Sequence, residues 1–131
     1  MLGALDTLNK KQQRSKKMVL SRDAILAVND HKFKVIPIPE WSGSVNIRTL
    51  TSAERDNLEA VFTSKEKNSL KDIRAKIAVM CVVDDSGKNL FTEQDIVELS
   101  KKSSAPMTTI FNAVMELNKF TNSDLEDLQG N

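Results

Sequence analysis

The sequence predicts an α+β fold, predominantly α-helical, in which about five short helices pack with one β-hairpin over residues 32–50. Two patterns support this fold class. Apolar residues recur at helical spacing in several segments, and one segment carries β-favouring residues on both sides of a short turn. The chain has 131 residues, of which 40% are hydrophobic and 28% are charged, as is typical of one globular domain.

The first 17 residues differ from the rest of the chain. Leucines spaced by three are followed at residues 10–17 by a run that contains five basic residues and nothing apolar to bury. Such a segment cannot build a core of its own. We therefore expect residues 1–17 to form a basic flexible arm and residues 18–131 to form a single globular domain.

The predicted hairpin consists of two strands and a turn that contains the only tryptophan. Residues 32–38 are rich in β-favouring side chains, and residues 41–44 read Trp-Ser-Gly-Ser, which predicts a turn. Residues 45–50 form the return strand. Because Pro37 and Pro39 have no N–H to donate, the first strand belongs at the edge of its sheet.

Capping residues and apolar periodicity predict the helices. We expect helices to begin after Ser21, Thr51, Ser69, Thr92 and Ser123. Glu54 completes a capping box with Thr51, and the helix after Ser69 is expected to run through the apolar stretch to Val83. A further helix carries the clearest apolar stripe, at spacing i, i+3, i+4, i+7 and i+8: Met107, Ile110, Phe111, Val114 and Met115.

Charge is distributed unevenly along the chain, although the net charge is only +1. Residues 1–34 hold eight basic and three acidic residues, whereas residues 84–131 hold four basic and nine acidic residues. Two opposed poles suit contact between copies of the chain, and the alternative is two separately solvated faces. The self-association candidates are Lys10, Lys11, Arg14, Lys16, Lys17 and Arg22 at one pole and Asp124, Glu126 and Asp127 at the other.

No catalytic set of residues emerges from the sequence. A single cysteine excludes an intramolecular disulfide, and a single histidine excludes a multi-histidine metal site. Cys81 lies in an apolar run where burial makes a thiol inert. We therefore predict that the protein is not an enzyme, that it needs no metal or cofactor, and that it acts by binding. The longest apolar run has seven residues, too few for a membrane span of about 20.

Several stretches, taken in order, resemble the tail assembly chaperones of long-tailed (siphovirus-type, lambda-like) bacteriophages. The stretches are residues 20–26, 38–45, 48–56, 82–91 and 95–99. The resemblance implies a non-enzymatic protein that binds the tape measure protein, keeps it soluble and helps to recruit tail tube subunits. It also implies self-association as a homo-oligomer or open helical multimer, a place in the host cell cytoplasm, and absence from the mature virion.

An apolar groove that accepts a helical segment would suit such a partner. Met107, Met115 and Phe120 are candidates for its lining, and the alternative is that the methionines belong to the core. Trp41, on its turn, is either an anchor for a partner or a lid over the protein's own core. A different function, that of a small nucleic-acid-binding regulator using the basic arm, is less favoured because the arm has no aromatic residue for stacking on bases.

Overall fold

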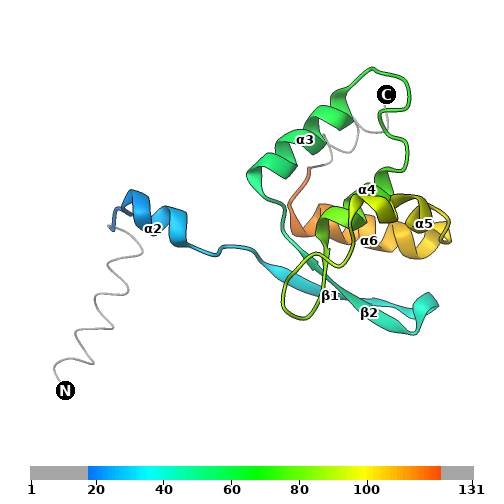
Figure 1. Cartoon of the computed structure of the whole chain (residues 1–131), viewed down its shortest axis with the longest axis horizontal. Helices are drawn as coiled ribbons and strands as arrows, with labels where there is room; N and C mark the ends of the chain where they lie inside the picture. Colours follow the sequence, from blue (N-terminus) through cyan, green and yellow to red (C-terminus); the bar gives the residue numbers. More distant parts are fainter. Residues whose placement is uncertain (1–17, 122–131) are drawn as a thin grey trace. The chain divides into compact units, whose positions relative to one another are not determined.

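The computed structural model describes residues 18–121, and the chain divides into two units, with the boundary in the sequence between Asp30 and His31 (Figure 1). Each unit is described by itself. The first contains helix α2 (Arg22–Ala27), and the second contains every other described element. The predicted boundary after residue 17 and the predicted helix after Ser123 fall on residues outside the described range, so both stay predictions.

Helix α2 begins where the sequence predicts. The Ser21 side chain accepts a hydrogen bond of 3.1 Å from the backbone N–H of Ala24, which is the geometry of an N-cap. The helix has only six residues, and none of them is buried.

The sheet has three antiparallel strands in the order β1-β2-β3. Strands β1 (Phe33–Ile38) and β2 (Gly43–Arg48) form the predicted hairpin, joined by the 3-10 turn η1 (Pro39–Trp41). Strand β1 lies at the edge, as predicted; Pro37 is within it, whereas Pro39 begins η1. The third strand, β3 (Val82–Val83), pairs with β2 through Ile47 opposite Val82 and Asn46 opposite Val83. The predicted fold class is confirmed, with one strand more than the sequence indicates.

The predicted helix from Ser69 to Val83 is wrong at both ends. Helix α4 spans Ile73–Cys81, after Asp72 adopts a left-handed conformation with φ 56°. The chain then becomes extended, and Val82 and Val83 enter the sheet. A short apolar run fits a buried helix and a buried strand equally well, so periodicity alone could not place this boundary. The β-branched pair was the available signal for a strand.

The remaining helices begin close to their predicted caps. Helix α3 (Ser52–Thr63) follows the Thr51–Glu54 capping box, in which both reciprocal hydrogen bonds are present. Thr92 and Asp95 form a second capping box ahead of η2 (Glu93–Asp95) and α5 (Ile96–Ser100). Helix α6 spans Ser104–Leu117, and the whole predicted apolar stripe on it is buried.

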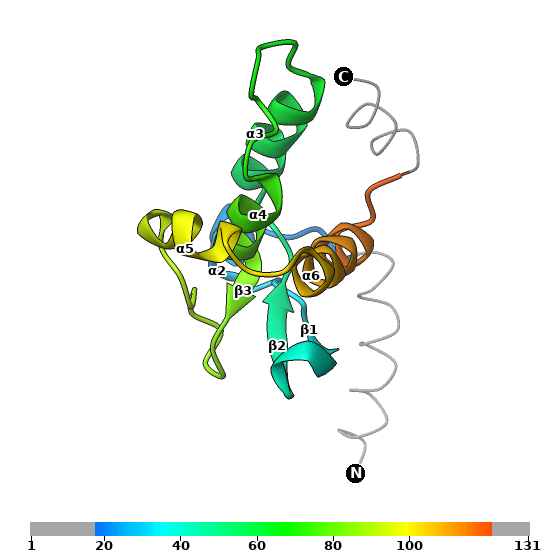
Figure 2. The same cartoon turned by 90° about the vertical axis from the view of Figure 1, so that its right-hand side faces the viewer.

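The core lies between the helices and one face of the sheet. Figure 2 shows α4 and α6 on the same side of the strands, and α6 packs on both β1 and β2. Ile36, Ile38 and Ile47 point into this core and are at most 7% exposed. Phe33 and Val35 alternate with them on β1 and stay 46% and 63% exposed, because successive side chains of a strand face opposite ways. We call their side the outer face of the sheet.

A partly buried ion pair links the hairpin to α3. The Arg48 guanidinium donates two hydrogen bonds of 2.9 Å to the two carboxylate oxygens of Glu54. The Arg48 side chain is only 9% exposed, and its Nε donates to Oδ1 of Asn89 at 3.3 Å. Glu54 also accepts from the backbone N–H of Thr51. This pair therefore links β2, the start of α3 and the chain before Leu90.

We expect Glu54→Gln to lower the free energy of unfolding at pH 7 by about 1.5–3 kcal/mol, because it removes charge-assisted hydrogen bonds. The hydrogen bond from Arg48 holds the pKa of the Glu54 carboxyl below its ordinary value of 4.5. The stabilisation is therefore complete above about pH 4.5 and is lost as the pH falls through the folded-state pKa.

Denaturant unfolding of the wild type and of Glu54→Gln between pH 7 and pH 3 measures this difference. It should shrink toward the acid end, and a difference that stays constant over the range would contradict the assignment. Glu59→Gln is the matched control, because Glu59 makes an exposed pair with Arg55 at 3.5 Å. It should change stability by no more than about 0.5 kcal/mol.

Candidate functional site

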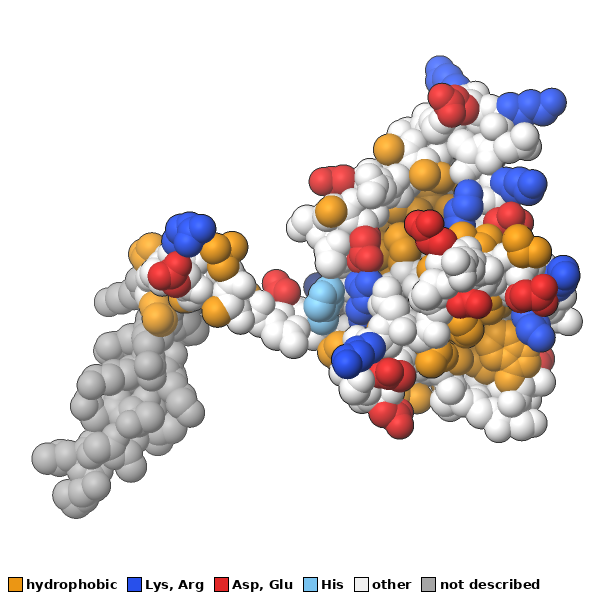
Figure 3. All heavy atoms as spheres, viewed as in Figure 1, with side chains coloured by type: hydrophobic (Ala, Val, Ile, Leu, Met, Phe, Trp, Pro, Cys, Tyr) orange, Lys and Arg blue, Asp and Glu red, His pale blue; other side chains and the backbone are white. Residues whose placement is uncertain are grey.

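A predominantly apolar hollow lies beside Trp41. It has a volume of about 370 Å³, and we call it the Trp41 groove. In Figure 3 a continuous hydrophobic area is exposed between the helices and the tip of the hairpin. The groove is lined by Trp41, Val45, Ala78, Val82, Leu90, Phe91, Leu99, Lys102 and Ile110.

The groove has a buried floor and an exposed apolar rim. Ala78, Val82 and Ile110 are at most 2% exposed and form the floor. Trp41 and Leu90, at the rim, are 39% and 54% exposed. The only charged side chain in the lining is that of Lys102. Such a surface binds apolar side chains, and it offers no acid–base pair for catalysis.

The rim residue Trp41 is positioned by the tip of the hairpin. Pro39 begins the 3-10 turn η1, in which Ser42 donates its backbone N–H to the carbonyl of Pro39 at 3.0 Å. Ser42 then adopts a left-handed conformation with φ 54°, and the chain returns as β2 at Gly43. This turn brings Trp41 to the groove from the end of the sheet.

The opposite rim is positioned by the turn at residues 84–88. Oδ1 of Asp84 accepts hydrogen bonds from the Ser86 hydroxyl at 2.7 Å and from the backbone N–H groups of Ser86 and Lys88. The bond from the Ser86 hydroxyl is the main reason why the pKa of Asp84 lies below its ordinary value. Leu90 then donates its backbone N–H to the Val82 carbonyl at 3.0 Å, which places its side chain beside the groove.

Gly87 is required in this turn. Its φ is +87°, and a Cβ at this position would lie 3.2 Å from the Phe33 ring. The close approach lets the turn cover Phe33, and residues with a side chain rarely adopt this backbone conformation.

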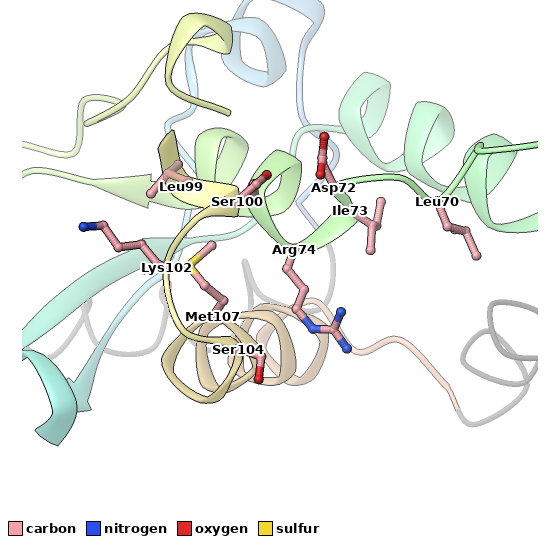
Figure 4. A pocket seen from close by; sticks show the side chains of 10 residues that line it. Leu70, Asp72, Ile73, Arg74, Leu99, Ser100, Lys102, Ser104 and Met107 are labelled. Atoms are coloured by element: carbon pink, nitrogen blue, oxygen red, sulfur yellow. The ribbon is translucent and has the colours of Figure 1, made fainter. Parts of the chain in front are cut away.

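A second hollow, of about 240 Å³, lies between α4, α5 and α6 (Figure 4). Its lining mixes apolar and polar side chains, and Leu99 and Lys102 border both this hollow and the Trp41 groove. Arg74 extends from α4 toward α6, where its Nε donates to Oγ1 of Thr108 at 3.0 Å. Because this hydrogen bond joins α4 to α6, we assign Arg74 a structural role in this hollow.

The structure separates the four side chains predicted to bind a partner. Trp41 lies at the groove rim, whereas Met107 and Met115 are 4% and 3% exposed and belong to the core. The structure thus places both methionines in the core, which was the alternative to a groove lining. Phe120 makes an edge-to-face contact with Phe62 at 5.8 Å, and the Arg55 guanidinium lies 3.9 Å from its ring centre. These contacts hold the end of α6 against α3.

Of the predicted self-association residues, Arg22 alone lies within the described range. Its Nη1 is 3.1 Å from the Asp23 carboxylate, and both side chains are over 80% exposed, so this ion pair contributes little to stability. Lys10, Lys11, Arg14, Lys16, Lys17, Asp124, Glu126 and Asp127 lie outside the described residues. The basic arm of the nucleic-acid alternative lies there too.

Chemical reactivity is low at the described residues that the sequence singles out. Burial raises the pKa of the Cys81 thiol to about 12. Nδ1 of His31, the single histidine, lies 3.1 Å from the Thr49 carbonyl oxygen. Within residues 18–121, no cluster of three or more His, Cys, Asp or Glu side chains could hold a metal ion. In the same range, no helix is both long and apolar enough to cross a membrane.

No protein-family model matches this chain, and no curated protein matches it at a significant level. A solved structure does match it: that of the bacteriophage HK97 tail assembly chaperone. The TM-score is 0.53 with 14% sequence identity, over 85% of this chain and 94% of that chain. The chain has the fold of a phage tail assembly chaperone. The match extends over nearly all of that chain, so the likeness concerns the architecture as a whole and agrees with the family resemblance in the sequence.

Cys81 should be inert toward thiol reagents while the protein is folded. At pH 8 we expect it to react with Ellman's reagent roughly a hundredfold or more slowly than an exposed thiol, because burial suppresses the thiolate. Lys65→Cys supplies the exposed thiol for comparison within the same chain. One fast equivalent in this variant and none in the wild type is the expected result. Fast reaction of native wild-type protein would show that Cys81 is not buried.

Proposed function

We propose that the protein is a tail assembly chaperone of a long-tailed phage of the siphovirus type. In this proposal it binds the tape measure protein in the host cell cytoplasm and keeps it soluble. It then helps to recruit tail tube subunits and leaves before the virion is complete. The observation that carries the proposal is the fold shared with the HK97 tail assembly chaperone over 94% of that chain. The stretches of sequence that resemble the same family support it independently.

The Trp41 groove supplies a physical basis for the chaperone activity. A long helical protein with apolar stripes aggregates when those stripes are exposed to water. An apolar groove of about 370 Å³ can take up the side chains along one turn of such a helix. Trp41 is then the anchor, because a large, half-buried aromatic side chain at a groove rim is the typical hot spot of an interface.

A long partner requires many chaperone copies. One groove covers a short length of helix, so protection of an extended tape measure protein calls for copies that associate along it. The opposed charges at the two ends of the sequence are consistent with head-to-tail contact, which generates open assemblies when the rotation does not close. Recruitment of tail tube subunits would use a surface that remains exposed in such an assembly.

Co-expression of the chain with the tape measure protein of the same phage tests the proposal. Wild-type chaperone should raise the soluble fraction of the tape measure protein several-fold, and Trp41→Glu should abolish that gain because it places a carboxylate in an apolar groove. Val97→Glu is the matched control, since Val97 is 62% exposed and lies outside the groove lining. Thermal melting of both variants checks that they fold.

Absence of any gain with the wild type would contradict the chaperone function, and equal gains with both variants would contradict the role of the groove. A second readout needs no mutation. Trp41 is the only tryptophan in the chain, so its emission should shift to shorter wavelength when a tryptophan-free tape measure peptide fills the groove. An unchanged spectrum at saturating peptide would also contradict binding there.

A further inference from the structure

Lys102 supplies the one charged side chain of the Trp41 groove, and every other lining residue is apolar. It lies in the connection between α5 and α6, where its backbone N–H donates to the Leu99 carbonyl at 3.1 Å. Leu99 is 8% exposed and lines the same groove, so this bond ties the backbone of Lys102 to the groove wall. The ammonium group is therefore carried on a long side chain from an anchored position beside the groove.

The Lys102 ammonium group forms no ion pair within residues 18–121. Two other cations of the same region do have partners. Lys101 pairs with Glu98 at 3.2 Å, and Arg74 is hydrogen-bonded to α6. Lys102 is therefore the cation here that a carboxylate from another molecule can pair with.

The neighbouring hollow between α4, α5 and α6 does not neutralise Lys102. Asp72 supplies the only carboxylate in the lining of either hollow. In Figure 4 its side chain lies well apart from that of Lys102 and extends away from it. With Arg74 and Lys102 against Asp72, the two linings together carry a formal charge of 2 − 1 = +1. The border between the two hollows thus favours an anionic group.

A partner that fills the groove takes water away from the Lys102 ammonium group. Removing water from a charge costs free energy unless an opposite charge or hydrogen-bond acceptors replace it. A wholly apolar segment offers no such replacement, and a basic segment repels the ammonium group. A segment with a carboxylate beside its apolar side chains forms an ion pair on binding. Lys102 therefore makes charge a criterion for binding in an otherwise apolar groove.

We propose that the Trp41 groove selects helical segments that carry an acidic residue one helical turn from the apolar residue in contact with Trp41, and that Lys102 binds this acidic residue. Residues one turn apart are neighbours on the same face of a helix, so both contacts can form together. The inference rests on the proposed function in one respect, namely that the occupant of the groove is a helical segment. It adds the chemistry of that segment, which is acidic and apolar.

Tryptophan-free synthetic peptides test this selection directly. The peptides share one stripe of leucines at helical spacing and carry glutamate, glutamine or lysine beside the stripe. Because Trp41 is the only tryptophan in the chain, its emission reports binding. At low salt the wild type should bind the glutamate peptide roughly three- to tenfold more tightly than the glutamine peptide, and the lysine peptide least tightly. The preference should weaken as salt is added.

Charge reversal at Lys102 isolates the contact. Lys102→Glu should reverse the order, so that the lysine peptide binds most tightly. Lys101→Glu is the matched control, because it makes the same change in net charge one residue away and Lys101 lines neither hollow. The pair that it breaks is exposed on both sides and contributes little to stability. This control should keep the wild-type order, and thermal melting checks that both variants fold.

Equal affinity of the wild type for the peptides, or no binding of any of them, would overturn the proposal. A loss of preference as large in Lys101→Glu as in Lys102→Glu would also overturn it, because net charge alone would then explain the selection. The co-expression experiment stands apart from these results, since a groove without charge preference can still keep the tape measure protein soluble. Conversely, selective binding of the glutamate peptide by a chain that leaves the tape measure protein insoluble would support selection by Lys102 and contradict the proposed function.

Discussion

The partly buried pair between Arg48 and Glu54 is the interaction on which the arrangement of this fold depends. Arg48 ends β2, Glu54 belongs to the capping box of α3, and Nε of the guanidinium donates to Oδ1 of Asn89, directly before Leu90. Breaking such a pair leaves a desolvated charge, although a hydrophobic replacement of both partners can be equally stable. Its contribution is therefore geometric as well as energetic. It orients the hairpin, which carries Trp41, relative to the helices and the turn that complete the groove.

Much of this architecture follows from local rules that the sequence displays. The two capping boxes begin at the predicted threonines, Pro37 marks β1 as an edge strand, and the apolar stripe of α6 is buried as its periodicity indicates. These features depend on neighbours within a few residues. Strand β3 and the burial of Arg48 depend instead on contacts between residues that lie 35 to 41 positions apart in the sequence. The alternation of side chains along β2 places Arg48 on the outer face of the sheet. Its partners there, Glu54 and Asn89, come from other elements, and the sequence alone does not show that they lie beside it.

The candidate site shows the same division. Trp41 could be singled out because it is a large residue on a turn, but the groove beside it combines residues from five separate stretches of chain, at 41–45, 78–82, 90–91, 99–102 and 110. Apolar periodicity could not distinguish a core methionine from a groove methionine, and Met107 and Met115 are in the core.

Hydrogen–deuterium exchange of this protein, alone and co-purified with the tape measure protein that we propose as its partner, tests the central claim most directly. Binding in the Trp41 groove should slow amide exchange at the hairpin tip around residues 39–45 and in the extended segment at residues 89–91. The solvent side of α3 should exchange as it does in the free protein. Protection confined to α3, or exchange that is unchanged throughout residues 39–91 in a complex that nevertheless forms, would contradict the claim.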